Sequence, residues 1–123
     1  MLISIRPHRT WRPAIAIVAG RRRVPVTTLL NPSFEVNLEA TDLALERVVD
    51  EGLFTLAGAR AARFRSYLDR PSQVRNYLEL INPPRPRFPR GGRARLDAMW
   101  DSAPRGGRIE VTESLIVNAL RRR

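Results

Sequence analysis

The chain has 123 residues, a formal net charge of +10, one histidine and no cysteine. A chain of this length builds one modest core, too small for a cofactor domain together with a substrate domain. The missing cysteines exclude disulfides and thiolate metal sites, and one histidine does not build a zinc or iron site without converging carboxylates, so we predict no metal site. No apolar run approaches the roughly 18 residues of a membrane span, so we expect a cytoplasmic protein with no membrane partner.

All 22 basic residues are arginine. This bias is typical of a GC-rich coding sequence, so part of the positive charge is compositional. The candidate anion-binding residues are Arg21, Arg22 and Arg23, in a run that has no aromatic neighbour for base stacking. A small arginine-rich domain that binds nucleic acid or an acidic protein is therefore the alternative function, and solvated loop charges are the interpretation that the sequence favours.

Residues 1–30 predict a strand followed by a β-hairpin. Leu2–Ile5 is a short apolar run that a proline ends two residues later, as at the end of a buried strand. The segments Ala14–Val18 and Val24–Leu30 are rich in β-branched residues and flank a connection of three to five residues that contains glycine.

Residues 31–81 predict a helix, a strand and a second helix. The first helix follows Ser33, which can cap its free amides, and Gly52 ends it. Ala57–Ala61 is predicted to be a small-residue connection, and Phe64–Leu68 alternates like a half-exposed strand. A second helix of about ten residues begins near the Asp-Arg-Pro-Ser sequence that follows.

The rest of the chain predicts a connector, a helix and a long strand. Asn82–Gly92 holds four prolines, which favours an extended surface connector. Residues 93–123 contain a third predicted helix, Arg95–Ala103, and the longest strand, Arg108–Leu120. Apolar side chains occupy both faces of that strand towards its C-terminus, so we expect it to lie inside a sheet. Glu113 stands on the apolar face and is expected to pair with an arginine rather than act as a functional carboxylate.

These elements predict a single domain, or part of one, of the α/β class and locally α+β. Its expected architecture is a small mixed three-stranded sheet with an appended β-hairpin and about three helices. None of the common nucleotide-binding, metalloprotease or hydrolase motifs occurs, so no catalytic, cofactor-binding or metal-binding residue is named. His8 follows the first strand, and a hydrogen-bonded or exposed loop histidine is the interpretation that we prefer.

Three segments carry a resemblance to a known family. ATDLALERVVDEGLF, ARFRSYLDRPSQVRNYLEL and RGGRIEVTESLIVNALRR, in that order, resemble the C-terminal portion of class I S-adenosylmethionine-dependent methyltransferases, particularly bacterial ones of the small-molecule type. In that family the antiparallel seventh strand lies between strands five and six. The resemblance implies that Leu2–Ile5 is strand five, Phe64–Leu68 strand six and Ile109–Leu120 strand seven.

The resemblance also implies what the chain does. The family's glycine-rich turn, which holds the cofactor, has no counterpart here, so no cofactor-binding residue is carried over. A Rossmann-like C-terminal region is implied, which is not catalytically competent alone, contributes structural and substrate-side surface, and binds S-adenosylmethionine only when a missing N-terminal half completes it. Arg6, His8 and Trp11 are the substrate-side candidates. Either that half or a homo-oligomer is expected to cover the open edge of strand five.

Overall fold

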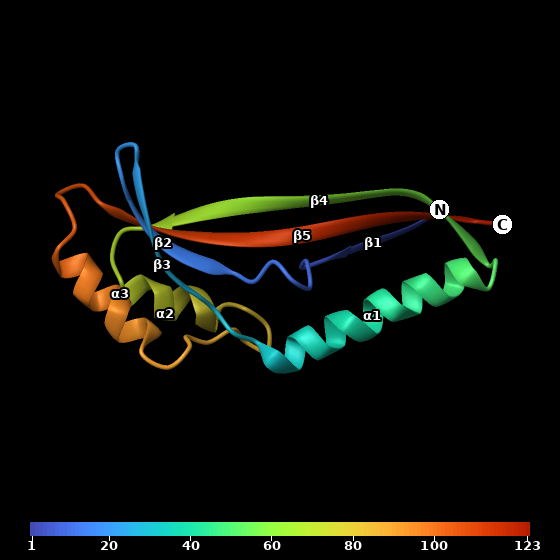
Figure 1. The fold of residues 1–123 in the computed structure, drawn as a ribbon, viewed down its shortest axis with the longest axis horizontal. Coiled ribbons are helices and arrows are strands. Elements are labelled where there is room, and N and C mark those ends of the chain that lie inside the picture. Colours follow the sequence, from blue (N-terminus) through green and yellow to red (C-terminus); the bar gives the residue numbers. More distant parts are fainter. The chain divides into compact units, whose positions relative to one another are not determined.

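The computed structural model describes all 123 residues. Five strands and three helices follow one another along the chain (Figure 1). In order, they are β1 (Leu2–Arg6), β2 (Ala14–Ala19), β3 (Arg22–Thr28), α1 (Pro32–Asp50), β4 (Phe54–Leu68), α2 (Ser72–Glu79), α3 (Gly92–Asp101) and β5 (Arg108–Arg122).

The residues form two compact units, and each is described by itself. Met1–Trp11, Pro32–Arg63 and Ser114–Arg123 make up the first unit. Arg12–Asn31 and Phe64–Glu113 make up the second unit. The long strands β4 and β5 therefore contribute residues to both.

The α/β class and the three helices are confirmed, but the predicted sheet is wrong in strand number and direction. The five strands form one open antiparallel sheet in the order β1-β5-β2-β3, and β4 also pairs with β5. The hairpin is part of this sheet, because β2 pairs along residues 108–112 of β5. Ile15 and Ile17 are only 1% and 5% exposed, and a strand buried to this depth needs hydrogen-bond partners for its backbone on both edges.

The hairpin turn is shorter than predicted. Only Gly20 and Arg21 separate β2 from β3, and Ala19 pairs directly with Arg22. Gly20 has φ of 59°, the positive value that a type II′ turn requires at its first central position. Because the turn is this tight, Arg22 and Arg23 belong to a strand rather than to a loop.

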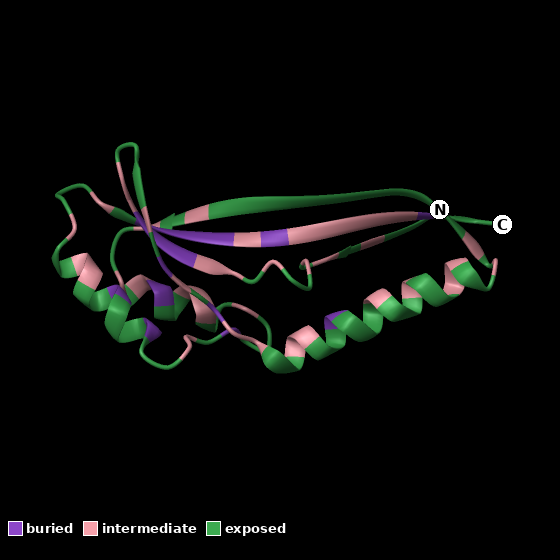
Figure 2. Ribbon diagram, viewed as in Figure 1, coloured by how far each residue is buried: buried purple, intermediate pink, exposed green.

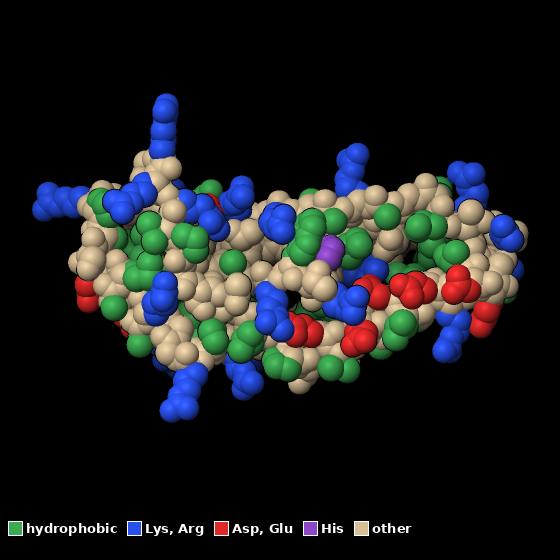
Figure 3. Space-filling view, in the orientation of Figure 1, with side chains coloured by type: hydrophobic (Ala, Val, Ile, Leu, Met, Phe, Trp, Pro, Cys, Tyr) green, Lys and Arg blue, Asp and Glu red, His purple; other side chains and the backbone are tan.

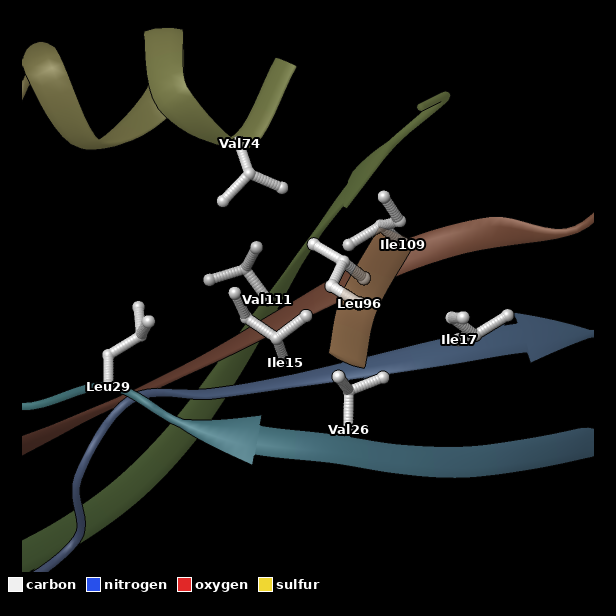
Figure 4. Close-up of a cluster of buried hydrophobic side chains, with 8 residues drawn as sticks. All are labelled: Ile15, Ile17, Val26, Leu29, Val74, Leu96, Ile109 and Val111. Carbon is white, nitrogen blue, oxygen red and sulfur yellow. The ribbon is translucent and has the colours of Figure 1, made fainter. Parts of the chain in front are cut away.

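The core of the second unit joins the strands β2, β3 and β5 to the helices α2 and α3 (Figure 4). Each helix contributes one side chain that is 1% exposed, Val74 from α2 and Leu96 from α3. Phe88 of the proline-rich connector packs against the same cluster. The connector is thus partly a core segment and not only a surface crossing. The buried members are Ile15, Ile17, Val26, Leu29, Val74, Leu96, Ile109 and Val111.

In the first unit, α1 packs against β1 and the C-terminal part of β5. Residues 2–6 pair with residues 116–120 of β5. Leu38 of α1 and Leu120 of β5 are buried, and an ion pair links Arg6 to Asp42 of the helix. The helix ends close to the predicted place, two residues before Gly52.

The strand β4 is much longer than predicted, because the small-residue segment 57–61 is strand and not connection. Residues 55–65 are all exposed (Figure 2). Glycine and alanine disfavour strands intrinsically, but hydrogen bonding along β5 outweighs this preference. The sequence of residues 57–61 does not alternate between large apolar and polar residues, and this alternation is the pattern from which strands are predicted.

The strand β5 lies inside the sheet, as predicted, since it pairs with β1, β2 and β4. Its burial runs opposite to the expectation. Ile109–Thr112 are buried on both faces, whereas residues 115–119 are only half-buried. The first stretch has the helical core on one face and a buried carboxylate, Glu110, with its partners on the other.

The short helices differ slightly from their predicted bounds. Eight residues form α2, against about ten expected, and α3 begins at Gly92, before the expected Arg95. A Cβ atom at Gly92 would stand 3.0 Å from Pro89 Cδ and 3.3 Å from Thr27 Oγ1. The early start was missed because glycine disfavours helices, whereas here the close approach of Pro89 and Thr27 favours a residue without a Cβ atom.

Replacing Ile109 by alanine should destabilise the chain by about 2–5 kcal/mol, because its side chain is 0% exposed and the change leaves a cavity. Leu80→Ala is the matched control, since Leu80 is 85% exposed and its loss should stay below about 0.5 kcal/mol. Denaturant unfolding measures both. Equal losses in the two variants would contradict the position of the core.

Candidate functional site

The loop after β1 brings His8 and Trp11 together. Their ring centroids are 4.2 Å apart and their planes differ by 11°, so the two rings stack. A turn in which Trp11 N donates to the His8 carbonyl at 3.3 Å holds them. Both side chains are half-buried, so each keeps some surface in contact with solvent.

Arg63 of β4 joins this pair. Its Cζ atom lies 3.9 Å from the centroid of a Trp11 ring, which is the distance of a cation–π contact. Sequence reasoning missed Arg63, because it is one of several arginines on an exposed strand and no local signal separates it from the others. The three residues, His8, Trp11 and Arg63, are called the Trp11 cluster below.

Ser114 of β5 holds the loop in place. Its hydroxyl donates to the Trp11 carbonyl at 2.9 Å and accepts from the His8 backbone N–H at 3.2 Å. The serine is 7% exposed. Its polar position in a strand was visible in the sequence, but its partners were not, since they follow from the pairing of distant strands.

The hydrogen bonds of His8 determine which ring nitrogen is free. Nδ1 accepts from the Thr10 backbone N–H at 3.3 Å, so the neutral ring carries its proton on Nε2. No carboxylate is hydrogen-bonded to the ring, so His8 lacks the orienting partner of a catalytic triad. Nε2 is the ring atom available to a ligand.

The structure does not bring Arg6 into the Trp11 cluster. Its Nε and Nη2 atoms donate to Asp42 Oδ1 at 2.9 and 2.6 Å. Nη1 donates to Asn118 Oδ1 at 2.7 Å and to Ser4 Oγ at 3.1 Å. The Arg6 side chain is 10% exposed, and its guanidinium is therefore engaged by the protein itself.

The three hairpin arginines are not brought together either. Arg23 Nε lies 2.7 Å from Oε1 of Glu110, a residue that is 4% exposed. Arg65 Nε lies 3.7 Å from the same oxygen. Arg21 and Arg22 stay exposed. On the face drawn in Figure 3, arginines are spread out and acidic side chains gather along α1.

The prediction that Glu113 pairs with an arginine is wrong. Its Oε2 accepts a hydrogen bond from the Tyr77 hydroxyl of α2 at 2.8 Å. A neutral donor thus satisfies the carboxylate on the core face of β5. Burial raises the pKa of Tyr77 to about 12, and the hydrogen bond and negative charge of Glu113 add to the effect.

The residues present do not fit the S-adenosylmethionine that the resemblance implies. A Rossmann-like cradle needs a glycine turn between a strand and the helix that follows it. Two strands, β3 and β4, are directly followed by helices, and their connections, Leu29–Asn31 and Asp69–Pro71, contain no glycine. No group of three or more His, Cys, Asp or Glu side chains could hold a metal ion.

Comparisons with protein-family models, with curated proteins and with solved structures found no match for this chain. None of its three helices is long and apolar enough to span a membrane. A proposal about function therefore rests on the strand order, the contacts and the charges of the chain itself.

The Arg6–Asp42 pair should contribute measurably to stability. Because the two side chains are 10% and 27% exposed, a double-mutant cycle with Arg6→Met and Asp42→Asn should give a coupling of about 1–3 kcal/mol. The exposed Arg75–Glu79 pair, 69% and 60% exposed, is the control and should give about 0.5 kcal/mol or less. Similar couplings for both pairs would contradict a structural role for Arg6.

Tyr77 should remain protonated at a pH where an ordinary tyrosine ionises. Its folded pKa of about 12 exceeds the ordinary tyrosine value of 10.0, so folding favours the protonated form and the free energy of unfolding should fall as pH rises between these values. In Tyr77→Phe this decline should disappear. Tyrosinate absorbance and denaturant unfolding against pH measure both effects, and an unchanged absorbance step near pH 12 in the variant would refute the assignment.

Proposed function

We propose that the chain is the C-terminal region of a Rossmann-like methyltransferase sheet, to which it contributes structural and substrate-side surface. The cofactor-binding strands lie on another segment or chain in this proposal. The observation that carries it is the strand order around β5. The region is not catalytically competent alone.

The order of the strands supports the proposal. The C-terminal strand β5 is antiparallel and pairs with both β1 and β4. Along the chain, α1 lies between β1 and β4, and two helices lie between β4 and β5. An antiparallel last strand between the strands in the positions of five and six is what the resemblance implies.

The open edge of β1 gives separate support. Its only partner strand is β5, and Ile3 and Ile5 are 58% and 68% exposed. An apolar edge strand with free N–H and C=O groups is a template for further pairing. Strands that continue the sheet, or a second copy of the chain, would cover it.

The Trp11 cluster is the substrate-side surface in this proposal. In the parallel part of a Rossmann-like sheet, ligands bind beyond the carboxyl ends of the strands. In this proposal β1 belongs to that part, and His8 and Trp11 lie in the loop that follows its carboxyl end. Because His8 and Arg63 already stack on the Trp11 indole, the groups that the cluster offers are the free Nε2 of His8, the outer face of its ring and the guanidinium N–H groups of Arg63. These groups suit hydrogen bonding and stacking rather than proton transfer.

The isolated chain should release no binding heat with S-adenosylmethionine in titration calorimetry, because the strand-to-helix connections lack the glycine turn.

The isolated chain should also self-associate through the open edge of β1. Ile5→Asp places a charge on that edge and should reduce the self-association measured by sedimentation velocity. Leu80→Asp, which places the same charge at an 85% exposed residue of the second unit, is the control.

The two readouts separate two failures. Micromolar binding of S-adenosylmethionine by the isolated chain would overturn the assignment of the cofactor site to another segment. Association that Ile5→Asp leaves unchanged, or that Leu80→Asp reduces equally, would instead show that the β1 edge is not the contact surface.

The arginine-rich binding domain remains the alternative proposal, with nucleic acid or an acidic protein as its partner. Arg21 and Arg22 are the exposed arginines of the hairpin that have no carboxylate partner. Binding through them would weaken steeply with salt, since it depends on counterion release. A low-salt mobility-shift titration without a shifted band would remove nucleic acid as the partner.

A further inference from the structure

The second unit contains a hollow between α2, α3 and the proline-rich connector. Its volume is about 270 Å³, close to the lower end of the roughly 300–1,000 Å³ typical of small-molecule pockets. Val74 and Leu96 at its floor are also core residues, so this part of the hollow is rigid. The apolar lining consists of Pro71, Val74, Leu78, Pro86, Phe88 and Leu96.

The rim of this hollow has an excess of positive charge. Four arginines and two carboxylates line it. Arg75 Nε lies 3.1 Å from Glu79 Oε1, so those two charges compensate each other. The guanidinium groups of the other three arginines make no ion pair, and the one remaining acid is Asp97. These three arginines are Arg85, Arg87 and Arg93.

The connector that carries two of these arginines is held in place. Leu30 and Arg87 exchange backbone hydrogen bonds of 2.8 Å in both directions. Asn31 Nδ2 donates to the Pro84 carbonyl at 2.8 Å. A binding site whose backbone is already ordered loses less entropy when a ligand binds.

We propose that this hollow binds a small organic anion: an aromatic or branched aliphatic body on the apolar floor, with a carboxylate or phosphate group among Arg85, Arg87 and Arg93. The two kinds of surface match the two halves of such a ligand. Guanidinium groups pair with carboxylates and phosphates through parallel hydrogen bonds. The site shares no residue with the Trp11 cluster, so a test of anion binding does not depend on whether the proposed function is correct.

Two other hollows do not match this chemistry. One in the first unit, of about 510 Å³, is lined by Asp42, Glu46 and Asp50 against the single, already paired Arg6. Another in the second unit, of about 380 Å³, has Arg22 as its one charged residue. Among these three hollows, charge complementarity favours the one beside the connector for an anion.

Titration calorimetry with the full chain tests the proposal with four probes. The probes 4-phenylbutyrate and 4-phenylbutyl phosphate carry both halves of the ligand, 4-phenylbutanamide lacks the charge, and acetate lacks the apolar body. We expect saturable binding of at least one of the first two, about tenfold weaker binding or more for the amide, and none for acetate. The stronger of the first two identifies the head group.

Variants locate the site. The double variant Arg87→Gln, Arg93→Gln should weaken anion binding about tenfold, whereas Arg105→Gln, a change at an exposed arginine of the same unit outside the hollow, should leave it unchanged. Because all three arginines are exposed, the variants should fold, and thermal unfolding checks this. Methyl NMR shifts on adding the probe should occur at Leu78 and not at Leu45 of α1.

Three results would overturn the proposal. The first is no saturable binding of either anionic probe at millimolar concentration. The second is equal weakening by Arg105→Gln and by the double variant, which would show attraction to the overall positive charge. The third is methyl shifts confined to α1.

Discussion

The backbone pairing of β5 is the constraint on which the rest of the structure depends. This strand of 15 residues pairs with β1, β2 and β4. Where its residues are buried on both faces, from Ile109 to Thr112, water cannot satisfy its N–H and C=O groups, so neighbouring strands must do so. The hairpin and β4 supply these bonds. Because this pairing fixes the position of each strand, it also fixes the loops and helices that are connected to the strands.

Burial of β5 creates a second demand, because five of its buried or half-buried side chains are polar: Glu110, Thr112, Glu113, Ser114 and Asn118. Glu110 is satisfied by Arg23, Glu113 by Tyr77, and Ser114 by the loop that carries His8 and Trp11. No buried side-chain nitrogen or oxygen is left without a hydrogen bond. The candidate substrate-side loop is thus positioned by the same requirement that holds the core together.

Local patterns explain what could be predicted from the sequence. The helix Pro32–Asp50, the hairpin and the internal position of the last strand all follow from spacing and turn residues within one segment. The strand β4 could not be found in this way, since its Gly- and Ala-rich middle is exposed and becomes a strand through pairing with β5. Contacts such as Arg63 with Trp11 join distant segments, and no spacing rule signals them.

The alternation in β5 was seen but interpreted incompletely. Its odd residues Ile109 and Val111 enter the core beneath α2 and α3, whereas the even residues Ile116 and Leu120 line the hollow beside α1. These apolar residues thus shift from odd to even positions along the strand. Such a shift indicates that the strand packs against a different element in each part, and it does not indicate that burial increases towards one end. Polar residues also lie at positions of both parities. Tyr77 donates a hydrogen bond to Glu113, an odd position, and Arg23 donates one to Glu110, an even position. Both donors lie on other elements, and sequence spacing alone does not connect those elements to β5.

Two groups of arginines stand out once partners are known, while others, such as Arg21 and Arg22, are exposed without a carboxylate partner. Arg6 and Arg23 neutralise carboxylates that the fold has buried or half-buried, so these two arginines stabilise the fold. The arginines around the hollow beside the connector have no such partner, although their backbone is ordered and an apolar floor lies between them. A coding bias accounts for the number of arginines in the chain. It does not by itself place three unpaired guanidinium groups around one apolar hollow, an arrangement that the proposed anionic ligand would use.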